Sequence, residues 1–324
     1  MTVRRTRRPE LLGFEQGRQR RQRPRLSRKA VVLMVVLLAV VLAAVWAAVT
    51  VAGRLLPLTA GPAAVHAPAP PTLPDGLPGQ LWARGTGSPP PPGITAPAAA
   101  VVDVDTGQVL WARAAHAHRP IGRLAILATV LASVRSPTQL HRQVVITGDM
   151  LGAGGIQIGL VPGQTVTVED LLAGSLLVGG SDAADSLAVW HSGSVEGFVS
   201  AMNRLARADG LKDTRFADPS GRFVQGTWSS AWDVAALARR VLLRRYLASL
   251  VSKQAYGNAV NANSLVFSYP SVTGVMAAPA TTGGVAVSMT LGKLHLLAVV
   301  LGGRHEAVQA LRLIHWAAHH DPAA

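Results

Sequence analysis

The sequence predicts an α+β fold: a sandwich of an antiparallel sheet with helices, behind an N-terminal transmembrane helix. Strand-like apolar segments lie at residues 98–113 and again at 284–301, and the chain between them has helical periodicity. Because a sheet must bury a face against another layer, we expect the early and late strands to join in one sheet that carries the helices. A continuous apolar run over residues 30–53 predicts the membrane helix.

Residues 1–29 form a strongly basic arm. Ten arginines and one lysine stand against two glutamates there, so the arm carries +9 of the chain's net charge of +14. A basic flank beside an apolar span predicts a cytoplasmic N-terminus. Binding to nucleic acid or to anionic lipid is the alternative for such a run. Phe14 is the only aromatic residue in the arm that could stack on bases, so no nucleic-acid partner is expected.

The apolar run over residues 30–53 is 24 residues long. A membrane helix needs about 20 residues, whereas the apolar part of a cleaved signal peptide has roughly 7–15. We therefore predict a single-pass anchor in the cell membrane with the following chain extracytoplasmic, while cleavage after Val65-His66-Ala67 stays open. Cysteine is absent from the sequence, which excludes disulfides and thiolate metal sites.

Residues 54–95 are rich in proline, with four consecutive prolines at 89–92. Such a composition favours extended backbone and resists packing into a core. A linker that separates a folded domain from the bilayer is therefore expected here. The extracytoplasmic domain is predicted to begin near Thr95 and to occupy residues 96–321.

The domain opens with a predicted hairpin. Ala98–Val104 and Gln108–Arg113 are apolar or alternating segments on either side of a Gly-containing turn. Asp103 and Asp105 lie around this turn, where backbone hydrogen bonding explains them better than a catalytic pair of carboxylates does. The hairpin thus supplies the early strands of the sheet.

Helices are predicted from Leu124 to Val134 and, after a Gly-rich stretch, over 171–178 and 182–190. Thr167 and Asp170 have the spacing of a helix start, in which the hydroxyl caps the helix and the acid faces its N-terminus. Gly179-Gly180 should break the helical chain between the last two segments.

The remaining elements have similar signals. Ser194 begins a helix that Gly210 ends, and Ser230 with Asp233 opens a helix through about Arg245. The period then changes to that of strands, joined by a tight turn at Gly292-Lys293. The expected late elements are strands at Gly284–Leu291 and Leu294–Leu301 and a final helix at His305–His319.

Five segments carry the functional signal. They read VVDVDTGQVLWARAAHAHRPIGRLAILATVLA, GQTVTVEDLLAGSLLVGGSDAADSLA, VEGFVSAMNRLARADGLKDTRFADPSG, SSAWDVAALARRVL and SVTGV. In the same order and at compatible spacing, they resemble the D-alanyl-D-alanine carboxypeptidases, low-molecular-weight penicillin-binding proteins of the serine peptidase type. The resemblance covers residues 96–304. It implies the penicillin-binding-protein and β-lactamase-like fold and a role in peptidoglycan metabolism of the cell wall.

The resemblance also locates three catalytic motifs, and each has lost reactive side chains. The family's first motif is Ser-x-x-Lys, whose serine is acylated and whose lysine activates it. Arg123 and Ile126 stand at those two positions. Gly179 and Ser181 replace the outer residues of the family's Ser-Gly-Asn motif, and Val272-Thr273-Gly274 replaces Lys-Thr-Gly without its lysine.

These losses predict a catalytically inactive, membrane-anchored homologue that binds or scaffolds in the cell envelope, because losing nucleophile and base costs orders of magnitude in rate. Candidate cleft residues for binding are Arg123, Ser181, Thr273 and Gly274. The candidate partners are peptidoglycan stem peptides or envelope-synthesis proteins. Two alternatives stay open: residual peptidase activity on stem peptides by a non-serine route, and a purely structural envelope protein whose cleft is filled by its own side chains.

Arg123 would stand in the first turn of a helix, where a cation opposes the helix macrodipole at a cost of about 0.3–1 kcal/mol. Two placements relieve this conflict. The guanidinium turns out to solvent, or an anion such as the terminal carboxylate of a stem peptide meets it in the cleft.

The ten histidines raise the question of a metal site. His315 and His319 are spaced to lie on one helix face, and His116 and His118 flank Ala117 just before the first motif. An exposed terminal helix and a solvated loop explain these two pairs better than metal ligation does. We expect neither a metal nor a cofactor, since no nucleotide-binding fingerprint follows any predicted strand.

Overall fold

The computed structural model describes residues 80–83, 91, 93–222, 225–277 and 283–320. The predicted basic arm (1–29), the membrane helix (30–53) and most of the predicted linker (54–95) lie outside the described residues. In the described ranges, no helix combines the length and the apolar character needed to cross a membrane.

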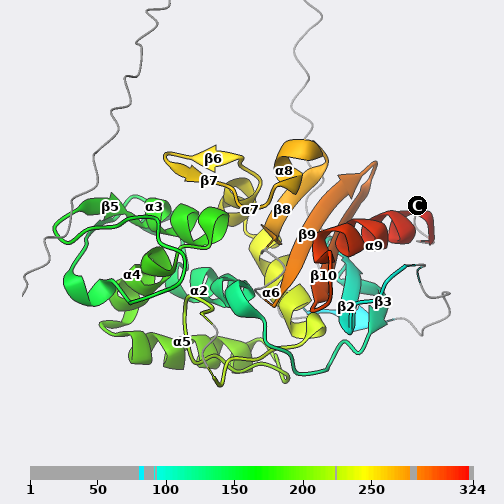
Figure 1. Cartoon of the computed structure of the whole chain (residues 1–324), viewed down its shortest axis with the longest axis horizontal. Coiled ribbons are helices and arrows are strands. Elements are labelled where there is room, and N and C mark those ends of the chain that lie inside the picture. Colours follow the sequence, from blue (N-terminus) through cyan, green and yellow to red (C-terminus); the bar gives the residue numbers. More distant parts are fainter. Residues whose placement is uncertain (1–79, 84–90, 92, 223–224, 278–282, 321–324) are drawn as a thin grey trace, which may run out of the picture. The chain divides into compact units, whose positions relative to one another are not determined.

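A six-stranded sheet organises the domain in the order β1-β3-β2-β10-β9-β8 (Figure 1). The pairing of β2 with β10 joins early and late chain, as predicted, and every pairing is antiparallel except that of β1 with β3. The six strands are β1 Trp82–Ala83, β2 Ala98–Asp103, β3 Gln108–Arg113, β8 Val272–Ala277, β9 Gly284–Leu291 and β10 Leu294–Leu301.

Helices cover both faces of this sheet. In Figure 1, α9 crosses one face over β9 and β10, while α6 lies behind the sheet and α2, α4 and α5 extend to one side. The helices are α2 Ile126–Ser133, α3 Val168–Ala173, α4 Ser181–Ser192, α5 Val195–Ala208, α6 Ala231–Leu243, α7 Arg245–Val251, α8 Leu265–Ser268 and α9 Glu306–His320. Two small hairpins complete the fold: β4 Gln143–Val145 with β5 Thr165–Thr167, and β6 Ala255–Tyr256 with β7 Ala259–Val260.

The core consists of two layers of apolar side chains separated by the sheet. Ala100 and Val102 of β2 point into the layer beneath α2, α4 and α6, whereas Ala99 and Val101 point into the layer beneath α9. Side chains alternate between the faces of a strand, so a central strand with both faces covered must be apolar at every position. The predicted α+β architecture, with a sheet between helices, is confirmed.

The structure also confirms the predicted helix start at Thr167 and Asp170 and the turn role of Asp103. The Thr167 Oγ1 accepts from the Asp170 N–H at 3.1 Å, and the Asp170 carboxylate accepts from the Thr167 N–H at 2.7 Å. Asp103 serves the hairpin turn, since its carboxylate accepts the Thr106 N–H at 2.8 Å. Several boundaries differ: the segment predicted as helix over 171–178 consists of α3 and a π-helical turn at Gly174–Val178, and the final helix is Glu306–His320 rather than His305–His319. The backbone becomes extended at Arg244, whose guanidinium donates to the Val134 carbonyl at 2.9 Å, so α6 ends before the predicted Arg245.

The sheet also includes residues that the composition assigned to the linker. The Trp82 N–H donates to the Gly107 carbonyl at 3.1 Å, and the indole N–H donates to the Thr106 carbonyl at 3.1 Å. The buried guanidinium of Arg239 reaches the Gln80 carbonyl at 3.3 Å. The folded domain therefore contains β1, ahead of the predicted start near Thr95, because an added edge strand needs only backbone groups and no strand-like composition.

Candidate functional site

The helix that corresponds to the first motif begins in a crowded position. Residues 122–125 form a 3-10 turn that leads into α2. A Cβ on Gly221 would lie 2.2 Å from the Gly122 carbonyl oxygen, and one on Gly283 would lie 2.5 Å from the Ile121 carbonyl carbon. Two other chain segments thus press against this turn through glycines, which is possible because glycine has no side chain.

Arg123 is buried, with only 6% of its surface exposed. Its Nη1 donates to the Val178 carbonyl at 3.0 Å. Among the described residues, no acceptor reaches its Nε or Nη2. Burial lowers the pKa of this guanidinium below its ordinary value. The solvent-facing placement is therefore wrong, and the structure holds a cation with most of its hydrogen-bonding capacity unused.

The guanidinium lies directly against Gly179, the position of the second motif's first serine. A Cβ built on Gly179 would come within 2.5 Å of the Arg123 Nη1, and the residue has a φ of +77°. Arg123 thus occupies the space that a serine at this position would need. The loss of the serine at 179 and the presence of the arginine at 123 are sterically coupled.

Arg123, Gly179, Asn263 and Met276 line a small enclosed space that is too narrow to admit a water molecule. The Asn263 Nδ2 has no partner among the described residues either. The space is therefore bordered by unpaired donors from two side chains. An unpaired buried donor costs about 1–3 kcal/mol. These donors suit an acceptor-only group such as a carboxylate, for which the space would first have to widen.

The third motif contributes to this space through Met276 rather than through Val272. Val272 is buried on the α9 side of the sheet. Thr273 Oγ1 lies 2.8 Å from Ser288 Oγ and 3.2 Å from His295 Nε2, and Gly274 packs against Val251. Neither Thr273 nor Gly274 borders the space at Arg123.

A bulge in the pairing of β8 with β9, between Val272 and Gly274, shifts the register there. As a result, Met276, four residues after Val272, is the residue of β8 that faces the first two motifs. Sequence reasoning missed Met276 because a bulge in an edge strand has no clear signature in composition.

Ser181 begins α4 and is covered by residues 152–160, which we name the cover loop. Its N–H donates to the Ile156 carbonyl at 2.6 Å, and a Cβ on Gly155 would lie 2.1 Å from its Oγ. Only 2% of Ser181 is exposed. The hydroxyl is thus closed off from solvent by the cover loop.

Asp182 holds this loop in place. Its buried carboxylate accepts the N–H groups of Ile158 and Gly159 at 3.0 Å and of Leu160 at 3.1 Å, as well as that of Ala183 at 2.9 Å. A carboxylate that accepts several N–H groups at a helix start is strongly stabilised. Sequence reasoning missed this role of Asp182, because the only signal for it in the sequence is an acidic residue in the first turn of a helix.

An ion cluster of two buried aspartates and a partly exposed arginine lies beside the same loop. Arg222 donates to Asp218 at 2.8 Å, contacts the Asp185 carboxylate at 3.0 Å, and donates to the Ala153 carbonyl at 3.1 Å. Burial raises the pKa of Asp185 to about 6, and the neighbouring Arg222 only partly offsets this effect. The cluster ties α4 to the cover loop and to the chain after α5.

This pKa predicts a pH-dependent stability. The folded protein keeps a proton on Asp185 up to about pH 6, whereas an unfolded aspartate loses its proton near 3.8. The free energy of unfolding should therefore fall as the pH rises from about 4 to 6, by at most about 1.4 kcal/mol per pH unit. Urea unfolding across this range should show a flatter profile for Asp185→Asn. The exposed control Asp149→Asn should keep the parent's slope, and equal slopes for both variants would contradict the assignment.

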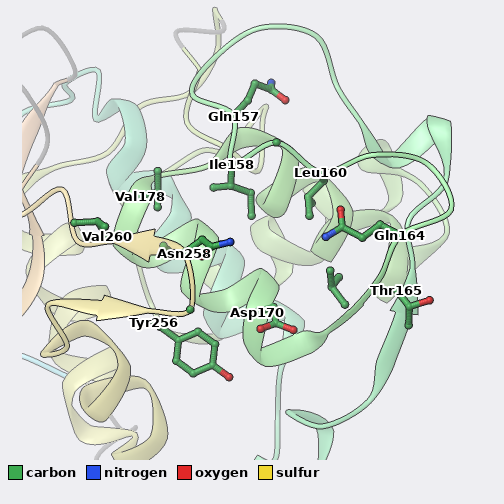
Figure 2. Close-up of a pocket in the computed structure, with 14 residues that line it drawn as sticks. Gln157, Ile158, Leu160, Gln164, Thr165, Asp170, Val178, Tyr256, Asn258 and Val260 are labelled. Carbon is green, nitrogen blue, oxygen red and sulfur yellow. The ribbon is translucent and has the colours of Figure 1, made fainter.

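An open groove of about 660 Å³ lies next to the closed space (Figure 2). One wall comes from Ile158, Leu160 and Gln164, and the other from Tyr256 and Val260 of the β6–β7 hairpin. Val178, whose carbonyl receives Arg123, borders both the groove and the closed space. The groove and the closed space thus share Val178, while Arg123 lines only the closed space.

Gly122, one residue before Arg123, faces a second open hollow of about 460 Å³ that His118, Arg119 and Trp228 also line. If the nucleophile position is instead Gly122, which faces an open hollow, the position of the motif lysine, three residues later, is Ala125. In neither register does the turn hold a serine and a lysine. The absence of a serine and a lysine from this turn therefore does not depend on the register.

Comparisons with known proteins identify relatives. A family model described as D-alanyl-D-alanine carboxypeptidase matches residues 85–302. D-alanyl-D-alanine carboxypeptidase DacF of Bacillus subtilis is 31% identical over 226 residues, which cover 64% of this chain and 57% of the relative. DacD of Escherichia coli is 30% identical over 253 residues, covering 71% and 64%. The chain thus spans between 57% and 64% of the length of these two relatives.

Solved structures agree with this result. Penicillin binding protein 6B of Escherichia coli is 26% identical and superposes with a TM-score of 0.66 over 73% of this chain and 81% of its own. A D-alanyl-D-alanine carboxypeptidase of Mycobacterium tuberculosis is 25% identical, with a TM-score of 0.66 over 73% and 96% of the two chains.

Proposed function

This chain belongs to the D-alanyl-D-alanine carboxypeptidase family, and we propose that it binds peptidoglycan stem peptides in the cell envelope without cleaving them. The observation that carries the proposal is the buried guanidinium of Arg123, which lies against Gly179 with unpaired donors. Acyl transfer needs a nucleophile and a base within hydrogen-bond reach of each other. At this position the chain offers a fixed cation instead.

The donor set supports binding of a carboxylate. Arg123 and Asn263 line the closed space and carry N–H groups without a partner among the described residues, and a guanidinium is suited to pair with a planar carboxylate. The groove of about 660 Å³ offers room for the rest of a peptide. Since Val178 borders both spaces, a peptide in the groove would direct its C-terminus toward Arg123 once the closed space opens.

The anchor predicted over residues 30–53 and the proline-rich segment after it fit this function. An extracytoplasmic domain held near the membrane would meet nascent stem peptides. Envelope-synthesis proteins are alternative partners for the same location.

Two measurements test the proposal on the purified protein. We expect no covalent band after incubation with fluorescent penicillin, with an active carboxypeptidase as positive control, and no release of D-alanine from a stem pentapeptide. A penicillin band that disappears when the protein is boiled beforehand would contradict the proposal, because it would show that the folded protein is acylated. Release of D-alanine would contradict it as well, because it would show residual peptidase activity.

Calorimetry with a stem pentapeptide should show binding that a C-terminal amide weakens at least tenfold. Arg123→Met should have the same effect as the amide, while Arg135→Met, at an exposed arginine, should bind like the parent. Absence of binding by either peptide would favour the purely structural alternative, with which the narrowness of the closed space agrees.

A further inference from the structure

A second cationic surface lies on α5 and the segment after it. Arg204, Arg207 and Arg215 line a hollow of about 520 Å³, at the edge of which Trp228 stands. All three arginines are exposed. Figure 1 shows α5 on the opposite side of the helical region from the β6–β7 hairpin that walls the peptide groove.

The polar neighbours of these arginines are already engaged. Asn203 exchanges hydrogen bonds with the Phe216 backbone at 2.8 and 3.0 Å, and the Thr214 hydroxyl is bonded to Ser229 and Asp233 at 2.7 Å. The guanidinium groups are thus the free donors of the hollow. Within the described ranges, no carboxylate lies within 4 Å of any of the three.

The acids nearest in sequence are bound elsewhere. Asp209 pairs with Arg240, and Asp213 pairs with His116 at 2.7 Å. Neither Asp nor Glu lines the hollow. The three guanidinium groups are therefore not paired with a lining carboxylate, which leaves their donors open to an external anion.

Trp228 also lines a second hollow. The same indole borders the second hollow, of about 460 Å³, where Arg119 adds a further cation and His118 stacks on the Trp228 ring with centroids 4.0 Å apart. No Asp or Glu lines this second hollow either. The two hollows thus lie on either side of a shared residue and carry cations in both linings. A linear polymer can reach into two neighbouring hollows, whereas a flat bilayer surface cannot.

From the arginines without a lining carboxylate and from these two hollows, we infer that the surface lined by Arg119, Arg204, Arg207 and Arg215 binds a linear phosphate-bearing polyanion of the cell envelope. Arginine pairs with phosphate oxygens in a bidentate manner, and several such contacts along one chain add up through avidity. The interaction should weaken steeply with salt because it releases counterions from the polymer.

The probe for this surface is long-chain sodium polyphosphate, with inorganic phosphate as the monomeric comparison. We expect the full-length protein to bind polyphosphate at least tenfold more tightly than phosphate, per phosphate group, and to lose most of this affinity between low and high salt. The triple variant Arg204→Ala, Arg207→Ala, Arg215→Ala should weaken the binding at least tenfold. All three side chains are exposed, so an unchanged unfolding temperature should accompany this loss.

The control replaces three exposed cations elsewhere, Arg142, Lys293 and Arg304, by alanine and changes the net charge equally. This variant should bind like the parent, and equal losses in both triple variants would reduce the effect to net charge and overturn the inference. Stronger binding to phosphatidylglycerol vesicles than to polyphosphate, lost in the first triple variant, would assign the surface to the membrane instead. Stem-peptide binding should not change in either variant, which separates this test from that of the proposed function.

Discussion

Asp182→Ala is expected to lower the free energy of unfolding by about 3–5 kcal/mol. The carboxylate accepts the N–H groups of three consecutive cover-loop residues, Ile158, Gly159 and Leu160. Removing it leaves these part-buried donors without their acceptor, and an unsatisfied donor costs up to about 1–3 kcal/mol when fully buried. The loop can recover part of this loss by opening to water. Urea unfolding measures the change, with Asp149→Ala, at an exposed carboxylate, as the matched control.

The same variant should change the groove. Ile158 and Leu160 form one wall of it, so a released cover loop would raise hydrogen exchange at residues 158–160 and weaken stem-peptide binding. The Asp149 control should leave both unchanged. A loss of stability below about 1 kcal/mol, with exchange at 158–160 unaltered, would contradict the role assigned to Asp182.

Arg123→Met should raise the free energy of unfolding by about 1–3 kcal/mol. Methionine keeps a long unbranched side chain while it removes a buried charge whose Nε and Nη2 have no described partner. Replacing a poorly paired buried charge by an apolar side chain of similar size is often neutral or stabilising. If Arg123 is kept for binding, the variant gains stability and loses affinity for the peptide that ends in a carboxylate. Substitutions at residues retained for function commonly have this pair of effects.

Arg239→Met is the matched control for this variant. Arg239 is fully buried, but its guanidinium donates to the carbonyls of Val104 at 2.6 Å, Asp105 at 3.0 Å and Gln80 at 3.3 Å. The control should lose about 3–5 kcal/mol because it leaves these carbonyls unpaired. A loss of similar size in Arg123→Met would show that Arg123 serves the fold and not a ligand.

The sequence predicts most of the fold because the signals are local. The turn at Gly292-Lys293 and the cap formed by Thr167 and Asp170 depend on residues within a few positions of each other. The continuous apolar character of β2 reflects burial on both of its faces. Those features need no knowledge of distant contacts, and the structure reproduces them.

The candidate site is predicted less completely. The absence of serine and lysine from the first motif can be read directly from the sequence, in either register. The helix position of Arg123 was predictable as well, but its direction was not. A cation at a helix start normally turns to water, and here it stays buried because Gly179 leaves the room for it.

By itself, the sequence determined the family, the order of the elements and the loss of the acylating residues. These depend on residue identity and on short-range spacing. Only the tertiary structure decided that Met276 rather than Val272 faces the motif positions, that Asp182 fixes the cover loop, and that Arg123 is buried against Gly179. Each of these depends on which distant backbone lies beside a side chain, and that follows from packing rather than from local spacing.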